Sequence, residues 1–319
     1  MHELARLSDQ AQLPAAYLEA VEAAREYLAA EKAAATRRAY RSDVAIFVAW
    51  CQARGLQALP CAPETLAAFL ADQAKTGSKL ATLRRRVAAI AYAHEAAGHE
   101  PPQSRLVKST MQGIARTIGA AKAQKAPVTA ERLRDMVKHC DGTLRGLRDR
   151  ALLLLGFAGA MRRSELVALT VADLEEVEEG LRVHVRRSKT DQEGAGQVIP
   201  VLNGSRFKVA EAVRAWLQAA QISEGPVFRP LRKGGEVLPV ALSTKSVAAI
   251  VKGYAERAGL DPALFAGHSL RAGFLTSAAV AGASVFKMME VSRHRSMETV
   301  RGYVRDAELF KDHAGSAFL

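Results

Sequence analysis

Several features that define other classes of protein are scarce or missing in this chain of 319 residues. The cysteines Cys51, Cys61 and Cys140 lie far apart without a C-x-x-C spacing, which indicates reduced thiols rather than a disulfide framework. No apolar run reaches the roughly 18 residues of a membrane-spanning helix. The N-terminal segment also lacks the basic-then-apolar pattern of a secretion signal, so we expect a cytoplasmic protein.

Two signatures of phosphate chemistry are also missing. The sequence has no G-x-x-x-x-G-K-[ST] segment of a nucleotide-binding loop. It offers no cluster of aspartates and glutamates that could hold a pair of metal ions. We therefore expect neither a metal ion nor any other cofactor.

Acidic residues are too few to balance the basic ones. The chain has 45 Lys and Arg against 33 Asp and Glu, which gives a formal charge of +12 and a pI near 9.8. Such a charge favours a polyanionic partner, nucleic acid first and an anionic membrane surface second. With 49 % hydrophobic residues the chain can bury a sizeable core, and its length suits two domains.

The first part of the chain carries the signals of a small helical bundle. An Ala- and Glu-rich stretch over 13–31 predicts a helix. Thr36, Ser78 and Ser104 are expected caps of three further helices, and Pro63 suits the first turn of another. The segment 119–127 has no apolar period and ends in a proline, so we place the domains at 1–122 and 123–319.

Charge is uneven within this helical domain. Residues 1–72 carry a net charge of −2, whereas residues 73–125 carry +8 and include Arg84, Arg85 and Arg86. Charge runs commonly form a solvated helix face, but the overall charge favours a surface that contacts phosphates. Aromatic residues are nearly absent from this stretch, which favours duplex over single-stranded nucleic acid.

The second domain mixes helices with one β-hairpin. Helices are expected from Thr129, over 144–155, over 205–218 and from Ser243 to residue 258. Alternating apolar residues over 181–185 and 197–201 predict two paired strands. The expected fold class is therefore mainly α, with a small β-hairpin or sheet in the second domain.

A helix junction at 159–166, Gly-Ala-Met-Arg-Arg-Ser-Glu-Leu, places charged residues beside core-like segments. Arg162 lies near the start of the second helix, and Glu165 follows three residues later. At that spacing the carboxylate can hold the arginine in a charge-assisted pair. Lys189 lies in the expected hairpin, where a lysine alone is usually only solvated.

The stretch 268–303 concentrates further candidates. His268 and Arg271 are three residues apart, which puts both on one helix face. Nine residues separate His294 from Tyr303, so one straight helix would set them on opposite faces. If both serve one site, the chain bends between them, and Ser296 is a plausible cap for a new helix. Tyr303 lies between Arg301 and Arg305, a setting that favours an ionised phenol.

In this order, the motifs resemble those of the tyrosine recombinase (phage integrase) family. The resemblance covers most of the chain, with the helical first part similar to the family's SAM-like core-binding domain. It implies DNA strand cutting and rejoining through a 3′-phosphotyrosine. It also implies the catalytic residues Arg162, Lys189, His268, Arg271, His294 and Tyr303, with Glu165 supporting the first arginine.

The chain departs from the family pattern at two positions. Ala272 follows Arg271 where many members have a second histidine, and Arg293 precedes His294 where a glycine is common. Neither departure removes a catalytic group. We expect the DNA contacts to come from a set of basic side chains, namely Lys79, Arg84, Arg85, Arg86, Arg163 and Arg187.

The chemistry also follows from the residue types. Two arginine forks can neutralise the extra charge on an attacked phosphodiester. Tyr303 must lose its proton, and His268 is the best candidate base. Lys189 could protonate the leaving 5′-oxygen, and His294 could donate a hydrogen bond to the phosphate.

Three functional classes remain open: a site-specific recombinase or integrase, a type IB topoisomerase, and a DNA-binding protein without catalysis. The partners expected for the first are double-stranded DNA and further copies of the chain in a tetramer, with the tail from Leu309 docking on a neighbouring subunit. For this class we also expect the protein to associate with the nucleoid in the cytoplasm.

Overall fold

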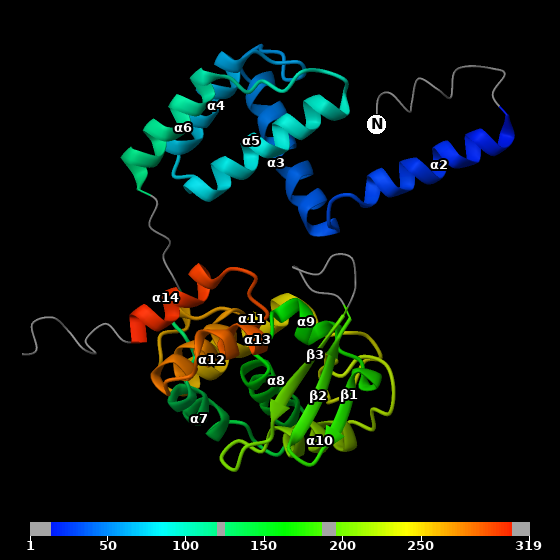
Figure 1. Ribbon diagram of the computed structural model, residues 1–319, viewed down its shortest axis with the longest axis vertical. Coiled ribbons are helices and arrows are strands. Elements are labelled where there is room, and N and C mark those ends of the chain that lie inside the picture. The colour runs from blue at the N-terminus through cyan, green and yellow to red at the C-terminus, as the bar shows by residue number, and fades with distance from the viewer. Residues whose placement is uncertain (1–13, 120–124, 187–195, 308–319) are drawn as a thin grey trace, which may run out of the picture. The chain divides into compact units, whose positions relative to one another are not determined.

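The computed structural model describes residues 14–119, 125–186 and 196–307 of the chain (Figure 1). The chain divides into two compact units, residues 1–123 and 124–319. We call them the N-terminal and the C-terminal unit. Each has its own cluster of buried apolar side chains.

The described part of the N-terminal unit is helical. Apolar residues of α3 to α6 form its core around Phe47 and Phe69, whose rings meet edge to face with centroids 5.0 Å apart. The helices are α2 (Ala15–Ala30), α3 (Ala34–Gln52), α4 (Pro63–Lys75), α5 (Leu80–Ala96) and α6 (Arg105–Ile118).

The helix starts follow local sequence signals in part. α4 begins at Pro63, and the Ser104 hydroxyl caps α6 by accepting from the Val107 amide at 3.4 Å. The expected cap Thr36 instead lies inside α3, because two alanines before it extend the helix. Ser78 stands one residue before the N-cap of α5, where its hydroxyl accepts a hydrogen bond from Arg86.

The C-terminal unit packs its helices around a three-stranded sheet and a central apolar helix. Its helices are α7 (Ala130–Lys138), α8 (Leu144–Ala158), α9 (Arg163–Ala168), α10 (Val209–Ala219), α11 (Thr244–Arg257), α12 (Ser269–Val280), α13 (Val285–Ser292) and α14 (Met297–Ala307). Two short 3₁₀ turns span Val171–Asp173 and Pro262–Leu264.

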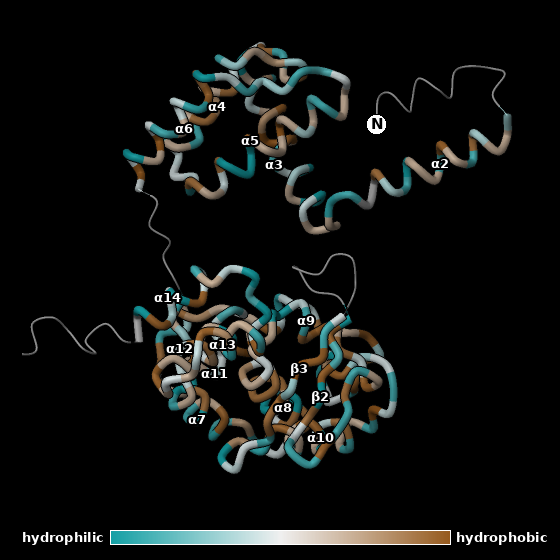
Figure 2. The backbone as a smooth tube through the Cα atoms, viewed as in Figure 1, coloured by the Kyte–Doolittle hydropathy of each residue, from teal (hydrophilic) through white to brown (hydrophobic). Residues whose placement is uncertain are grey.

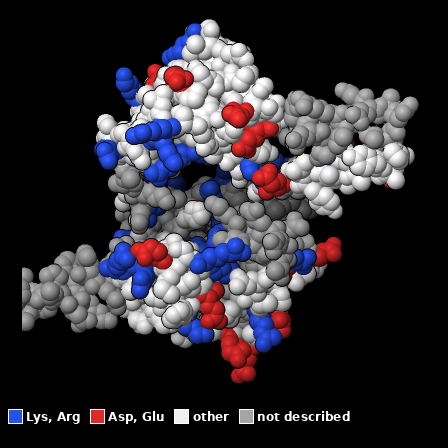
Figure 3. Space-filling view, turned by 45° about the horizontal axis from the view of Figure 1, so that its top comes forward, with Lys and Arg blue, Asp and Glu red and all other residues white. Residues whose placement is uncertain are grey.

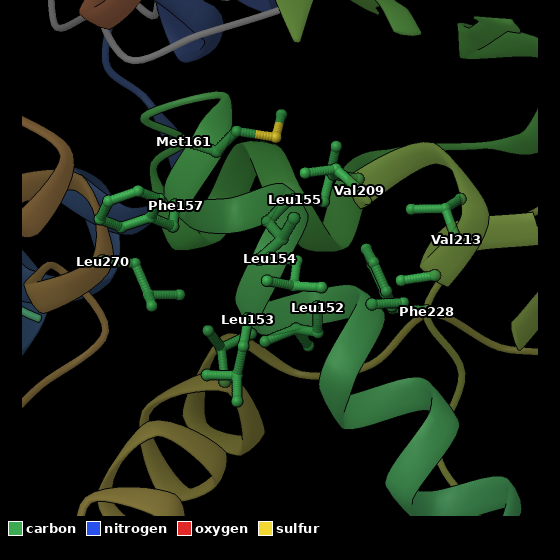
Figure 4. Close-up of a cluster of buried hydrophobic side chains, with 14 of the residues drawn as sticks. Leu152, Leu153, Leu154, Leu155, Phe157, Met161, Val209, Val213, Phe228 and Leu270 are labelled. Carbon is green, nitrogen blue, oxygen red and sulfur yellow. The ribbon is translucent and has the colours of Figure 1, made fainter. Parts of the chain in front are cut away.

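Helix α8 forms the centre of this unit, and the hydrophobic residues along it stand out in Figure 2. Leu152, Leu153, Leu154 and Leu155 are all buried, so the helix is apolar on every side in its second half. Figure 4 shows these leucines among side chains of α10 and α12, including Val213 and Leu270. The end of α8 is thereby held firmly, and the candidate junction at 159–166 begins there.

The sheet is antiparallel, in the order β1 (Leu174–Val177), β2 (Gly180–Val185) and β3 (Gln197–Leu202). The predicted pairing of the last two strands is confirmed, with Val183 opposite Ile199. Strand β1 was not expected, because its two central glutamates are exposed and give no apolar alternation. The predicted fold class, mainly helical with a small sheet, is confirmed.

The chain bends between the last two candidate residues. Helix α13 ends at Ser292, and α14 begins at Met297, directly after the expected cap Ser296. His294 therefore lies in a loop and Tyr303 on a separate helix. Within the described residues, no helix combines the length and apolar character needed to cross a membrane.

Candidate active site

The turn between α8 and α9 forms the floor of the candidate site. Ala160 adopts a left-handed backbone with φ of 43°, and both Ala160 and Met161 are buried. The Ala160 carbonyl accepts from the Arg271 guanidinium at 2.7 Å and from Arg293 at 3.3 Å. One backbone oxygen thus ties two distant arginines to the same turn.

Arg162 and Glu165 form the pair expected from their spacing. The Arg162 guanidinium donates to one carboxylate oxygen at 2.6 Å, and the Arg162 backbone amide donates to the other at 2.9 Å. Glu165 is buried, which by itself would raise its pKa, but Arg293 and Arg162 outweigh this and hold the pKa below its usual value. The carboxylate therefore stays ionised and fixes the start of α9.

Arg271 points inward from the first turn of α12 and is 5 % exposed. Burial, together with the charges of Arg162 and Arg293, lowers its pKa to about 9, which leaves it protonated at neutral pH. The guanidinium groups of these three arginines face a single carboxylate within this cluster, that of Glu165. The excess positive charge suits an anion such as a phosphodiester.

His294 lies against Arg271, with both ring nitrogens 3.2 Å from the guanidinium Nη2. The buried Ser292 hydroxyl donates to the Met288 carbonyl and lies 2.7 Å from His294 Nδ1. Because that hydroxyl proton is already used, the hydrogen-bond network assigns the imidazole proton to Nδ1. Burial and then Arg271 lower the pKa of His294 to about 4, so the ring is neutral and Nε2 carries the lone pair.

His268 precedes α12 as its N-cap residue and is exposed, whereas Arg271 is buried. The spacing predicted both side chains on one helix face, but His268 stands just before the helix and the two residues meet different surroundings. The exposed position places His268 at the surface of the C-terminal unit.

Tyr303 is half-buried on α14 and packs on a small apolar cluster that includes Leu275 and Met288. It is also among the groups whose charge acts on the pKa of Arg271. The break before α14 thus brings the phenol to the same region as the arginine, about 30 residues further along the chain than Arg271.

Arg293 and Ser292 belong to this cluster but were not among the site residues predicted from the sequence.

Arg293 makes the longer-range contact. The residue is 6 % exposed, and its guanidinium donates to Glu165 at 2.7 Å. The available signal was its place directly before His294, at the end of an apolar helix. Sequence spacing gave no hint that Glu165, more than 120 residues away, would be its partner.

Lys189 and Arg187 lie outside the described residues. The strands that flank them are described, and the end of β2 lies near the site. A cavity of about 330 Å³ is lined by Glu165 on α9 and by Val185 and Arg186 at that end. The described end of β2 and Glu165 thus line one cavity.

The expected DNA contacts of the N-terminal unit divide into two kinds. Lys79 and Arg84 are exposed, and Arg85 is half-exposed while donating two hydrogen bonds to Asp43, at 2.6 and 3.0 Å. Arg86 differs from the expectation, because it is buried and donates to the side chains of Gln73 and Ser78. Its fork holds helices together and is not available to a phosphate.

Exposed basic side chains occur on both units, as Figure 3 shows in blue. In the C-terminal unit, Arg163 is exposed directly after Arg162. Among the described residues, no group of three or more His, Cys, Asp and Glu side chains is arranged to hold a metal ion.

Comparison with known proteins links both units to one family. Residues 126–309 match the phage integrase family, and residues 22–100 match the N-terminal SAM-like domain of phage integrases. The chain is 41 % identical over 298 residues to an integrase/recombinase XerD homolog of Selenomonas ruminantium, a match that covers 91 % of this chain and 87 % of that protein. The tyrosine recombinase XerD of Bifidobacterium longum is 27 % identical over 290 residues, covering 85 % and 86 %.

Solved structures show the same fold at lower identity. A lambda integrase dimer bound to a COC′ core site aligns with a TM-score of 0.62 and 18 % identity, over 90 % of this chain and 94 % of that one. The XerH site-specific recombinase bound to palindromic difH substrate aligns with a TM-score of 0.57 and 17 % identity, over 78 % and 70 %. The family match spans more than half of the chain and confirms the resemblance seen in the motifs, so this chain belongs to the phage integrase family of tyrosine recombinases, whose reaction is site-specific recombination.

Proposed function

We propose that this chain cuts and rejoins duplex DNA at specific sites, with Tyr303 as the nucleophile and a 3′-phosphotyrosine as the intermediate. The observation that carries the assignment of residues is the cluster in which Arg162 pairs with Glu165 and His294 contacts Arg271. Tyr303 is close enough to this cluster to act on the pKa of Arg271. A cluster with excess positive charge and a nearby phenol suits in-line attack on a phosphodiester.

The bond changes balance without an external energy source. The Tyr303 oxygen attacks phosphorus, a phosphotyrosine bond forms, and the bond from phosphorus to the 5′-oxygen breaks. His268 accepts the phenol proton, and Lys189 gives a proton to the 5′-oxygen, which leaves as a hydroxyl. Because the covalent link keeps the phosphodiester energy, attack by another 5′-hydroxyl rejoins the strand.

The arginines stabilise the transition state. Arg162 and Arg271 offer two donor forks to the non-bridging oxygens, where negative charge increases during attack. His294 is neutral before substrate binds, with its lone pair on Nε2. The arriving phosphate raises the pKa of His294, so that Nε2 takes up a proton and donates it in a hydrogen bond to the phosphate.

The DNA partner is held by both units in this proposal. The N-terminal unit serves as the DNA-binding domain through Lys79, Arg84 and Arg85, and the C-terminal unit adds Arg163 and Arg187. The lambda integrase and XerH structures contain DNA, which supports a duplex partner. We further propose a tetramer on two paired sites, formed on the nucleoid, in which the tail from Leu309 docks on a neighbour.

A nicked suicide substrate tests the reaction. After cleavage the short fragment beyond the nick diffuses away, so that a protein joined to DNA accumulates and migrates more slowly in a denaturing gel. The native chain should form this product, and Tyr303→Phe should bind the same DNA without forming it. Duplex from the flanks of the gene supplies candidate sites. Failure of the native chain to form a covalent product on a duplex that it binds specifically would contradict the proposal.

A further inference from the structure

Arg293 occupies a backbone position that disfavours an arginine. It is the C-cap of α13 and adopts a left-handed conformation with φ of 57°. Only glycine takes this conformation without steric cost. The side chain is also costly to bury, since its Nε has no hydrogen-bond partner among the described residues. A strained backbone and a buried unpaired donor both destabilise the fold, so the Arg293 side chain is expected to have a role in the site that offsets them.

The Arg293 guanidinium binds the same turn that holds the other site arginines. Its Nη1 donates to the carbonyls of Gly159 at 3.2 Å and Val291 at 2.8 Å. Its Nη2 donates to the Ala160 carbonyl at 3.3 Å and to Glu165 Oε2 at 2.7 Å. The end of α13 is thereby joined to the turn between α8 and α9.

These contacts complete the coordination of the Glu165 carboxylate. One oxygen, Oε1, accepts from the Arg162 guanidinium, and the other accepts from the Arg162 amide and from Arg293. Without Arg293, the second oxygen keeps only the Arg162 amide as a donor, so the carboxylate is held less tightly. The Arg293 carbonyl also lies 3.4 Å from Arg162 Nη2. Arg162 is therefore restrained from two sides by one residue.

We propose that Arg293 is a positioning residue that aims the Arg162 fork at the scissile phosphate by locking Glu165. This inference rests on the proposed function. Arg293 is too deeply buried to reach the DNA itself, so its effect passes through Glu165 and the Gly159–Ala160 turn. A misplaced Arg162 would bind DNA as before and would stabilise the transition state less well.

The first test compares Arg293→Gly, Arg293→Met and Arg293→Lys with the native chain. Each is assayed for duplex affinity and for the single-turnover rate of covalent product formation on the nicked substrate. We expect affinity within about threefold of native and a rate about 10- to 100-fold lower for the glycine and methionine variants, with the lysine variant in between. Added guanidinium ion should partly restore the glycine variant, whose missing side chain leaves a space of that shape.

A double-substitution cycle separates positioning from general stability. Glu165→Gln removes the charge that Arg293 holds, so adding Arg293→Met should slow cleavage by less than about twofold more. Arg232→Met is the matched control. It also removes an arginine that pairs with a glutamate, but Arg232 and Glu236 are exposed, with 3.2 Å between the guanidinium and the carboxylate. This variant should leave the cleavage rate unchanged.

The outcomes separate the two proposals. A native chain that forms no covalent product would overturn the proposed function, whatever the Arg293 variants do. If the native chain forms the product and the folded glycine and methionine variants form it at the native rate, the positioning role is wrong. Full additivity in the cycle would contradict the role through Glu165. The double variant Arg293→Met, Glu165→Gln buries no unpaired charge at these two positions. It can therefore be assayed even if one of the single variants fails to fold.

Discussion

The Arg271 guanidinium lies 3.2 Å from the ring nitrogens of His294, and this contact couples the charge states of the two side chains. A protonated imidazole beside a buried guanidinium would be repelled, and it would also lose solvation. The pKa of His294 is accordingly lowered to about 4, chiefly by burial and next by Arg271. The free protein therefore holds this histidine neutral.

This coupling predicts how stability depends on pH. The folded pKa of His294 lies below its unfolded value near 6.5, so the unfolded chain binds more protons between about pH 6.5 and pH 4. Stability should be fully present above this window and should fall as the pH drops through it. We expect the His294 share to be about 1 to 2 kcal/mol, since the ring is only partly buried. Urea unfolding at pH 7 and pH 4.5, for native protein and His294→Gln, measures it. Equal losses in the two proteins would contradict the assignment.

Ser292 should decide which nitrogen of His294 carries the proton. Its hydroxyl accepts from Nδ1 because its own proton goes to the Met288 carbonyl. Ser292→Ala removes the acceptor, so we expect a mixture of tautomers and a cleavage rate about tenfold lower. Nitrogen-15 NMR of the labelled ring in both proteins reports the tautomer directly. A single Nδ1-protonated form in the variant would show that another group sets it.

Lysine should not replace Arg271. One Nη group of Arg271 donates to the Ala160 carbonyl and the other contacts His294, a geometry that requires a planar fork. We expect Arg271→Ala and Arg271→Lys each to lower the single-turnover cleavage rate by at least about 100-fold. The comparison is informative because lysine keeps the charge. A lysine variant within tenfold of native would mean that charge alone suffices.

Gly273 on α12 is expected to be essential for folding rather than chemistry. A β-carbon there would lie 1.7 Å from the Val128 carbonyl oxygen, while the Val128 amide donates to the Ser269 carbonyl at 2.9 Å. Gly273→Ala should therefore lower the free energy of unfolding by about 3 kcal/mol. Gly253 on α11 has no atom within 4 Å of the same position, so Gly253→Ala should be neutral or stabilise by up to about 1 kcal/mol. Thermal and urea unfolding of both variants would test this difference.

Local spacing predicted the parts of the site that lie close in sequence. Arg162 and Glu165 are three residues apart and pair as expected, and the helix break between His294 and Tyr303 followed from the geometry of a helix. The interactions that were missed join distant segments. The contact between Arg293 and Glu165 joins the C-terminal end of α13 to α9, which are far apart in sequence, and no local pattern encodes it.

The same reason explains the differences in the N-terminal unit. The sequence does not distinguish the three consecutive arginines Arg84, Arg85 and Arg86. Of these, only Arg86 is buried in the bundle, where Gln73 and Ser78 accept its hydrogen bonds. Asp43 receives two hydrogen bonds from Arg85, although 42 residues separate them. Net charge predicted a basic surface, but it could not say which of the three arginines packs inside.

The identity of the nucleophile is best tested by mapping the covalent link. Protein joined to a nicked duplex is digested with trypsin and a nuclease, and the modified peptide is sequenced by mass spectrometry. Cleavage after Arg301 and Arg305 places Tyr303 in the peptide Gly-Tyr-Val-Arg, which contains one tyrosine. We predict a nucleotide phosphate on that tyrosine. A nucleotide on Tyr254, on Tyr92 or on any residue outside this peptide would contradict the account.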